Sequence, residues 1–483
     1  MKRGFIFYVG FLLLVIFGAA LVGLVVLFCS PGKEILGFTY YSYSDKIVCE
    51  TTSDDSKTPL ELGTLKKYSE VQINADYAKV ELSHSKKYEK NAIIIINNAK
   101  GFTLAKDAVD FDYSVLVENG VLKVSVTEPQ GFLAFSKDIK IIVHIADKEA
   151  DPFVNTNFTI KTGSGSIELG GAVKSASDYD ISVGQLLLET KSGLISITPR
   201  VNGDEDRKTQ TFSQLAMHTG SGKFTASVER INVLGKATLL ANNGGKYSFD
   251  ELAVLGETFI KTAGGTYKMH MLSCLLNPLM VECANGYFYI DEILGDVKFP
   301  CADVNIDSPK FKSDKIYGDF TVVAGNGMNV EIGDITGSAN IVTKNGSVTI
   351  GKGENTGLGG VATIKTESGK IVAYVKGGND SVKEFTTENG EVQLYLLGQV
   401  LSSTTVNTKN GNVKVKFETG KAYTISFTYQ TKTDAYDLGK VKFVDYPNVE
   451  MKNPFVYTED SAVRGLIEIH TDANVELSLF ATK

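Results

Sequence analysis

One short phrase recurs along the middle of this chain, and it limits the possible folds more than any other feature. The phrase reads Thr, any residue, Ser or Asn, Gly, any residue, then an apolar residue that favours strands. Successive phrase glycines are 18 to 29 residues apart, and most steps are near 21. A period of this size indicates a solenoid or another repeat array rather than a compact globule. The phrase begins at Thr162, Thr190, Thr219, Thr262, Thr343, Thr366, Thr387 and Thr408, with degenerate copies at Asn242, Cys283, Asp307 and Ala324.

Each phrase opens a segment in which apolar and polar residues alternate. After Gly390, for example, Val392 and Leu394 are apolar. This period of two predicts a strand with one buried face and one solvent-facing face. Because glycine favours a left-handed turn and asparagine tolerates one, we expect each repeat to be a turn followed by a strand. The phrase glycines are Gly165, Gly193, Gly222, Gly245, Gly265, Gly286, Gly327, Gly346, Gly369, Gly390 and Gly411, with Pro309 in one slot.

The spacing of the strands selects one fold class. No helical pattern of useful length separates them, which excludes a parallel sheet with helical crossovers. A propeller blade needs about 40 residues, roughly twice the period found here. The sequence therefore predicts an all-β fold, a single-stranded-repeat β-solenoid of about 12 short coils. Each coil buries its apolar row against its neighbours, at a spacing of about 4.8 Å.

A solenoid exposes strand edges at both ends, so both ends need covering segments. Residues 66–150 contain strand-like segments without the glycine phrase and are expected to form N-terminal β layers. Residues 151–418 carry the solenoid repeats, and residues 419–483 contain longer strand patterns that suit a C-terminal β cap. Residues 31–65 are polar and irregular and are expected to form a stalk, after a cytoplasmic tip and transmembrane helix in residues 1–30.

An uncharged apolar run extends from Gly4 to Cys29. As a helix rising about 1.5 Å per residue, it is long enough to cross a hydrocarbon core of about 30 Å. Lys2 and Arg3 precede the run, and positive charge beside a membrane helix favours the cytoplasmic side. We therefore expect a single-pass cell-membrane protein with a cytoplasmic N-terminus and an extracellular bulk.

Two other interpretations of this run remain open. Gly18 and Ala20 are small residues at a spacing typical of signal-peptide cleavage, but the apolar run continues for nine residues beyond Ala20. Lipidation of Cys29 would need a small residue before it, and Phe28 is bulky. An uncleaved anchor is therefore the expectation.

Charge and motif content exclude several function classes. The chain has 49 Lys and Arg residues against 56 Asp and Glu residues, so its net charge of −7 argues against nucleic acid as a partner. The outward positions of the first four coils show no paired carboxylates, which glycan-cleaving enzymes need. No G-x-S-x-G elbow, P-loop or HExxH motif occurs, and five histidines are scattered. We expect a protein without catalytic residues.

Three of the five cysteines lie within 28 residues: Cys274, Cys283 and Cys301. Disulfides are permitted outside the cytoplasm, so one local bridge in this group is a candidate, without a preferred pairing. A metal site is disfavoured because there is no paired C-x-x-C and the nearest histidine, His270, stands alone. No metal or cofactor is expected.

Candidate binding residues lie at outward strand positions after the phrase glycines. Lysines there are candidates for a basic stripe that binds an anionic polymer such as a cell-wall glycopolymer, although edge-protecting lysines are the simpler interpretation. Two aromatics in the coil opened by Gly286 are candidates for stacking on sugar rings, although loops carrying Cys274 or Cys301 would be able to cover them. The lysines are Lys223, Lys246, Lys268, Lys310, Lys312 and Lys370, and the aromatics are Tyr287 and Tyr289.

With its repeat laid out, the chain resembles the bacterial "putative adhesin" family of surface proteins, whose members carry plain N-terminal strands followed by tandem T-x-[SN]-G-x-[IV] coils. Residues Ile139 to Gly171 look most like the start of the family's coils, and the resemblance covers roughly residues 66–420. It implies a β-solenoid and a surface location, and it supplies no catalytic residues. Residues 242–330 depart from the pattern, with Pro309 in place of a glycine.

These observations favour a membrane-anchored extracytoplasmic β-solenoid that acts by binding a cell-surface glycan, wall polymer or protein. The alternative is a structural or envelope-sensing membrane component that uses the solenoid as a scaffold for a protein partner.

The anchor can be tested by N-terminal sequencing of the protein extracted from membranes. We expect the mature chain to retain Gly4 at its N-terminal end, because the apolar run is longer than that of a signal peptide. An N-terminus near Leu21 would show that the segment is removed.

Overall fold

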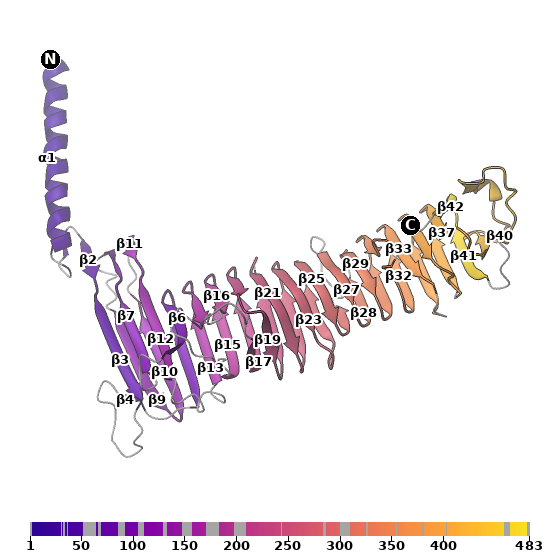
Figure 1. Ribbon diagram of the computed structural model, residues 1–483. Coiled ribbons are helices and arrows are strands. Elements are labelled where there is room, and N and C mark those ends of the chain that lie inside the picture. Colours follow the sequence, from indigo (N-terminus) through magenta and orange to yellow (C-terminus); the bar gives the residue numbers. More distant parts are fainter. Residues whose placement is uncertain are drawn as a thin grey trace. The chain divides into compact units, whose positions relative to one another are not determined.

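The computed structural model is nearly all β, with one N-terminal helix (Figure 1). Two compact units are present, unit 1 (Met1–Glu205) and unit 2 (Asp206–Lys483). Their boundary falls inside the predicted repeat region, and the five-segment division made from the sequence stays a prediction. The structure describes residues 2–29, 31, 34–35, 37–51, 64–65, 69–85, 92–104, 111–128, 133–146, 157–170, 183–197, 209–242, 244–283, 286–299, 310–324, 327–353, 355–377, 381–401, 403–457 and 464–480.

In unit 1, helix α1 (Lys2–Cys29) covers the predicted anchor. Its stretch Tyr8–Val26 has a mean hydropathy of 2.9, and none of that stretch is buried. A helix suits a bilayer because it satisfies its own backbone hydrogen bonds, and a signal sequence has the same composition. The predicted helix is confirmed, and its membrane role stays a prediction.

The chain after α1 forms strands where an irregular stalk was expected. β1 (Glu34–Ile35), β2 (Phe38–Ser42), β8 (Lys100–Leu104) and β11 (Leu133–Ser136) make an antiparallel sheet in that order. β3 (Asp45–Thr51) pairs with β4 (Thr64–Leu65) and with β7 (Ala92–Asn97). The irregular structure expected for residues 31–65 is therefore wrong where β1 to β4 form, because aromatic and β-branched residues favour strands even in a polar segment.

Unit 1 contains a coil that lacks the glycine phrase. β5 (Glu70–Ala75) and β6 (Lys79–Ser85) pair in parallel with β13 (Asn157–Thr162) and β14 (Ile167–Leu169) on one side. On the other side they pair in parallel with β10 (Val121–Thr127) and β12 (Ile139–Ala146). Antiparallel strands β9 (Asp112–Glu118) and β7 then pair with β10 and β12. β15 (Val183–Thr190) continues from β13, and β16 (Leu194–Ile197) continues from β14.

Unit 2 is a parallel β-solenoid in which, from β20 to β37, each strand pairs with the strand two places along the chain. The pre-phrase sheet holds the strands before each phrase, and the post-phrase sheet holds those after it. Pre-phrase strands are β17 (Thr209–Thr219), β20 (Ala237–Ala241), β22 (Thr258–Thr262), β24 (Leu279–Cys283), β26 (Val297–Phe299), β28 (Phe320–Ala324), β30 (Ala339–Thr343), β32 (Ala362–Thr366), β34 (Lys383–Thr387), β36 (Thr404–Thr408) and β41 (Gly465–Thr471). Post-phrase strands are β18 (Lys223–Ala226), β21 (Lys246–Val254), β23 (Thr266–Ser273), β25 (Tyr287–Leu294), β27 (Lys310–Ile316), β29 (Asn329–Ile335), β31 (Val348–Ile350), β33 (Ile371–Lys376), β35 (Val392–Leu397), β37 (Val413–Glu418) and β42 (Val475–Phe480).

The longer post-phrase strands turn a corner. The first part of β21 pairs with β18, and its last residues pair with β19 (Arg230–Val233), which also pairs with the first part of β17. The coils here therefore have three sides rather than two. The predicted all-β solenoid is confirmed. Each coil contains more than one strand, whereas the sequence predicted one strand per coil.

The core of unit 2 changes character along the stack. In its first coils, the inward position after the phrase holds aromatic rings, with centroids 4.9 Å apart for Tyr247 and Tyr267 and 5.2 Å apart for Tyr267 and Phe288. The Tyr247 hydroxyl donates to the Leu240 carbonyl at 2.6 Å, which satisfies a polar group that is otherwise buried. Later coils hold buried aliphatic residues such as Val392 at the same position.

The phrase threonine and glycine act together at the turn. The Oγ1 atoms of Thr190, Thr387 and Thr408 each accept a hydrogen bond from the amide of the phrase glycine three residues later, at 2.8, 3.0 and 2.9 Å. These threonines are buried, so their side chains stabilise the turn from inside the coil.

The predicted reason for the glycines was wrong. Phrase glycines such as Gly369, Gly390 and Gly411 do not have a positive φ, whereas positive φ occurs at other glycines such as Gly398. A Cβ on Gly411 would lie 1.8 Å from the Gly390 carbonyl oxygen, and one on Gly390 would lie 2.0 Å from that of Gly369. Glycine is needed at these positions because the backbones of successive coils approach too closely there for a side chain.

One phrase position is shifted by one residue. Gly327 was expected to occupy the slot, but a Cβ on Gly346 would meet the Met328 carbonyl oxygen at 2.0 Å, so Met328 occupies it. The register follows the buried row, since Val330 pairs with Phe311 and with Val348. The apolar residue that must point inward fixes the register more strongly than the glycine does.

The C-terminal end of unit 2 does not follow chain order. β41 pairs with β36, and β42 pairs with β37. The preceding strands β38 (Tyr423–Thr428) and β39 (Val441–Phe443) lie outside them, paired with β41 and β42. β40 (Phe455–Tyr457) adds to β38 in antiparallel orientation, and the 3-10 helix η3 (Leu438–Lys440) precedes β39. The last strands are therefore inserted between the solenoid and its cap.

The close approach predicts a substitution effect. Gly390→Ala should lower the free energy of unfolding by about 1–3 kcal/mol, because its Cβ would overlap a backbone carbonyl that cannot move independently. Urea unfolding followed by circular dichroism measures the change. Gly353→Ala is the control, since no atom lies within 4 Å of its Cβ position, and should change stability little. Equal effects would contradict the close-approach account.

Candidate binding surface

The predicted lysines and tyrosines lie on adjacent strands of the post-phrase sheet. In parallel register, one outward row contains Lys223, Lys246, Thr266, Tyr287 and Lys310. The second row contains Ser248, Lys268, Tyr289 and Lys312. Neighbours in a row are about 4.8 Å apart along the stack. We name the group Lys223, Lys246, Lys268, Tyr287, Tyr289, Lys310 and Lys312 the Lys–Tyr face.

Three lysines of this face are exposed and lack an acidic partner. Lys223 and Lys246 are direct register partners on β18 and β21, and Lys268 follows on β23. Within the described residues, no carboxylate lies within 4 Å of their ammonium groups. Like charges placed opposite each other on paired strands are unfavourable. A bound anion would relieve that repulsion.

Tyr287 and Tyr289 stand side by side next to these lysines. Their rings are nearly parallel, at 7° with centroids 6.5 Å apart, and Tyr287 is 47% exposed. Tyr289 is the register partner of Lys268 on one side and of Lys312 on the other. The arrangement offers flat apolar surface between positive charges, which suits a ring that carries an acidic group.

The far end of the face is neutralised by one acid. Glu331 on β29 binds Lys310 at 3.5 Å and Lys312 at 2.7 Å. The hydrogen bond from Lys312 holds the pKa of Glu331 below its usual value, and the same bond raises the pKa of Lys312. Lys310 and Lys312 therefore carry less free positive potential than the three unpaired lysines.

Lys370 lies apart from the Lys–Tyr face. It binds Glu391 at 2.9 Å, and Glu391 also binds Lys414 at 3.2 Å. The coils between, with Glu331 and Thr349 in the second row, interrupt the stripe. The structure thus brings together five of the six predicted lysines and both tyrosines.

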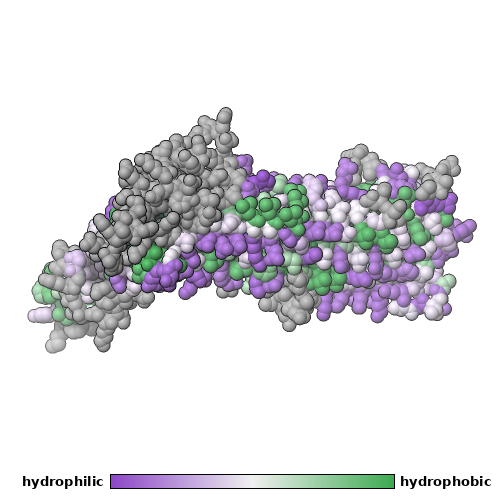
Figure 2. Space-filling model, turned by 90° about the horizontal axis from the view of Figure 1, so that it is seen from below, coloured by the Kyte–Doolittle hydropathy of each residue, from purple (hydrophilic) through white to green (hydrophobic). Residues whose placement is uncertain are grey.

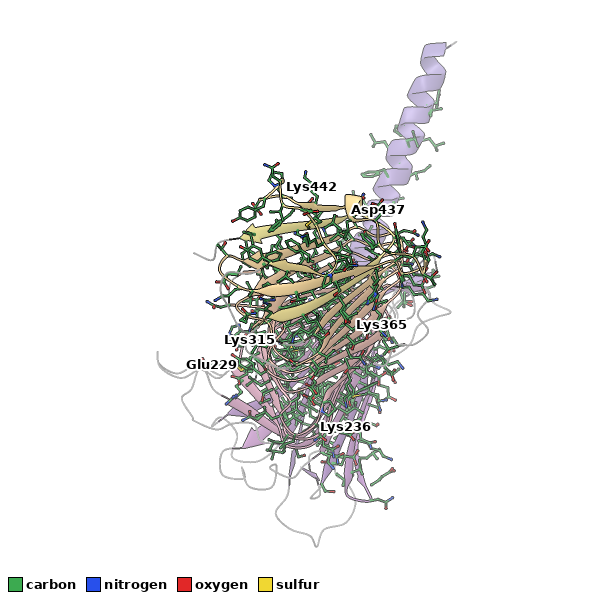
Figure 3. All side chains as sticks on the ribbon, turned by 90° about the vertical axis from the view of Figure 1, so that its right-hand side faces the viewer. Glu229, Lys236, Lys315, Lys365, Asp437 and Lys442 are labelled. Carbon is green, nitrogen blue, oxygen red and sulfur yellow. The ribbon has the colours of Figure 1, made fainter. Side chains whose placement is uncertain are left out.

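Lysines on the pre-phrase side are arranged differently. Lys236 binds Glu257 at 3.2 Å, Lys261 binds Glu282 at 2.8 Å, and Lys365 binds Glu384 at 3.4 Å. Each pair joins one coil to the next. Figure 3 shows Lys236 and Lys365 on the opposite side of unit 2 from Lys315 and Glu229. Paired lysines on that side link adjacent coils, and they provide a comparison for the unpaired ones.

The structure describes only part of the cysteine group for which a disulfide was predicted. Cys274 is buried as a free thiol, and burial raises its pKa to about 11. Its Sγ lies 3.9 Å from the Asp296 carbonyl oxygen. Cys301 and the side chain of Cys283 lie outside the described residues, so the local bridge stays a prediction.

Within the described part of the chain, no three His, Cys, Asp or Glu side chains are placed to hold a metal ion. His270 makes a surface contact with Asp291 at 3.2 Å, and this hydrogen bond raises the pKa of His270. The contact joins adjacent coils, as the lysine–glutamate pairs do.

Sequence reasoning missed an exposed row of leucines. Leu234, Leu255, Leu275 and Leu276 lie at the corner after β19, β21 and β23 and are 54–71% exposed. The recurring Val-Leu-Gly at residues 233–235 and 254–256 was the available signal. Among its coloured residues, Figure 2 shows a largely hydrophilic face with smaller hydrophobic patches.

No protein-family model matches the chain, and no curated protein matches it. Among solved structures, a putative adhesin from Parabacteroides merdae is 9% identical, with a TM-score of 0.24 over 77% of this chain and 96% of that chain. A putative cell adhesion protein from Clostridium sporogenes is 10% identical, with a TM-score of 0.13 over 91% of this chain and 100% of that one. A putative lipid binding protein from Parabacteroides distasonis is 12% identical, with a TM-score of 0.17 over 77% and 98%. Similarity at this level carries no argument about ligand or mechanism.

Removing the neutralising acid should strengthen polyanion binding. Glu331→Gln leaves Lys310 and Lys312 without an acidic partner on this face, so we expect affinity for polygalacturonate to rise about two- to fivefold. Glu282→Gln breaks a comparable pair on the other side and should leave affinity unchanged. Biolayer interferometry with the full chain in nanodiscs measures both. An equal gain in both variants would mean that net charge alone matters.

Proposed function

We propose that the protein is a membrane-anchored, extracytoplasmic binding protein without catalytic activity, and that its Lys–Tyr face binds an acidic polysaccharide at the cell surface. The single observation that carries this proposal is the placement of three unpaired lysines beside two parallel tyrosines on consecutive coils.

Electrostatics supports a polymeric ligand over a small one. Lys223, Lys246 and Lys268 are spread over three coils, so each ligand charge would meet one or two ammonium groups only. An exposed contact of this kind contributes about 0–1 kcal/mol. Several such contacts on one chain of linked charges add through effective concentration. A polymer is therefore the ligand class that a shallow periodic surface binds best.

The tyrosines support a sugar rather than a purely anionic polymer. Both rings stand next to lysines, and Tyr287 is almost half exposed. An aromatic face packs against the apolar face of a sugar ring. Uronic acid units combine that apolar face with a carboxylate, which suits both parts of the surface.

The proposed lack of catalytic activity is supported by the acids found on the Lys–Tyr face. Within the described residues, Glu331 is the acid that contacts this face, and it is paired with Lys310 and Lys312. Glycoside cleavage needs two carboxyl groups across the scissile bond. A binding role requires none.

The test compares two matched triple variants of the full chain in lipid nanodiscs, with polygalacturonate as the probe. Replacing Lys223, Lys246 and Lys268 by Gln should weaken binding at least about tenfold, and binding by the unaltered chain should fall steeply as salt rises. Replacing Lys236, Lys261 and Lys365 by Gln changes the net charge equally on the paired side and should have little effect.

A second comparison separates stacking from charge. Tyr287→Ala with Tyr289→Ala should weaken binding to polygalacturonate but not to polyglutamate, which has no sugar rings. Salt-independent or absent binding of the unaltered chain would remove the proposal. Absence of binding together with α1-dependent copurification of a membrane protein would favour the scaffold alternative.

A further inference from the structure

The small sheet β1-β2-β8-β11 has a polarity gradient along its strands. At one end Ile35, Phe38 and Leu104 are register partners across β1, β2 and β8. Phe38 and Leu104 are 36% and 40% exposed, so this end presents apolar side chains to its surroundings. At the other end Ser42 pairs with the exposed Lys100.

Aromatic residues occupy the middle of the gradient. Tyr40 on β2 packs against Phe102 on β8 with centroids 5.4 Å apart. Tyr43 contacts Phe111 at 5.8 Å, beside the polar end of β2. Along one face of the paired strands, the order is Phe and Leu, then Tyr and Phe, then Ser and Lys, and the aromatic pair Tyr43 and Phe111 lies beyond this end. A bilayer surface has the same order, from acyl chains through the aromatic-rich interface to water.

The chain itself limits how far this sheet lies from α1. Four residues separate Cys29 at the end of α1 from Glu34 at the start of β1. Five extended peptide steps reach at most about 18 Å. α1 also contacts β1 and β2, and Figure 1 shows β2 near the C-terminal end of α1. If α1 spans a membrane, this sheet lies at the membrane surface.

The position of Leu104 does not follow from the short connection between α1 and β1. Leu104 lies 75 residues beyond Cys29 in the sequence, so no short linker holds it near the helix. Its pairing with Phe38 alone places it at the apolar end of the sheet. An exposed Phe–Leu pair in a sheet that contacts a membrane helix is unfavourable in water and suits the boundary of headgroups and acyl chains.

We propose that the sheet β1-β2-β8-β11 rests on the outer bilayer surface, with Phe38 and Leu104 inserted among the lipid headgroups. This inference rests on the proposed membrane anchoring by α1. The sheet provides a second lipid contact beside the helix, and it holds unit 1 at the membrane instead of leaving it free to swing.

The absence of tryptophan from the chain gives a clean test. Single Trp residues are introduced into the full chain, reconstituted into phosphatidylcholine vesicles with plain or brominated acyl chains. Leu104→Trp should give blue-shifted emission that is quenched by the brominated lipid. Lys100→Trp, on the same strand about 13 Å away, should give water-like emission with little quenching.

Two further variants test the anchoring by α1 and the sheet contact separately. Phe17→Trp in α1 should be quenched strongly; its failure would disprove the anchoring itself. Quenching of Phe17→Trp without quenching of Leu104→Trp would overturn the sheet contact and leave anchoring intact. Phe38→Trp, an aromatic replacement in the register partner, gives the same readout should the Leu104 variant not fold.

Discussion

The close backbone contact between successive coils is the constraint on which the solenoid depends. At Gly369, Gly390 and Gly411 the backbone lies so close to a carbonyl oxygen of the previous coil that a Cβ atom would not fit. The buried hydroxyl of a phrase threonine such as Thr408 holds the turn at that point. Parallel strands on either side then pair in register, so that each inward residue lies on the equivalent residue of the next coil.

In-register stacking of the coils also places residues that repeat in the sequence next to one another on the surface. Outward residues of successive coils form rows, and in several rows a Lys of one coil pairs with a Glu of the next, as Lys261 and Glu282 do. The Lys–Tyr face departs from this rule over three coils. A row of like charges costs free energy in the free protein. Binding of an acidic ligand, as we propose for this face, would offset that cost.

Sequence patterns predicted the fold better than the surface. The repeat, the strand alternation and the apolar helix were readable because each depends on residues close in the chain. Glu331 was not recognised as the partner of Lys310 and Lys312, because it lies one coil further along and its partnership depends on register. Likewise Lys370 has the same sequence position as Lys246 after its phrase glycine, and the two differ only in what the adjacent coils supply.

By itself the sequence determined the all-β solenoid, the turn positions and the N-terminal helix, since hydrophobic periodicity and the glycine phrase act locally. Tertiary structure alone decided the order of layers at both ends: β5 and β6 lie between strands that follow them, and β41 and β42 lie inside strands that precede them. It also decided that Met328 replaces Gly327 in its slot, and that Leu104 lies beside Phe38. Strand pairing of this kind depends on which apolar rows can be buried together, and that is a property of the packed chain rather than of any segment.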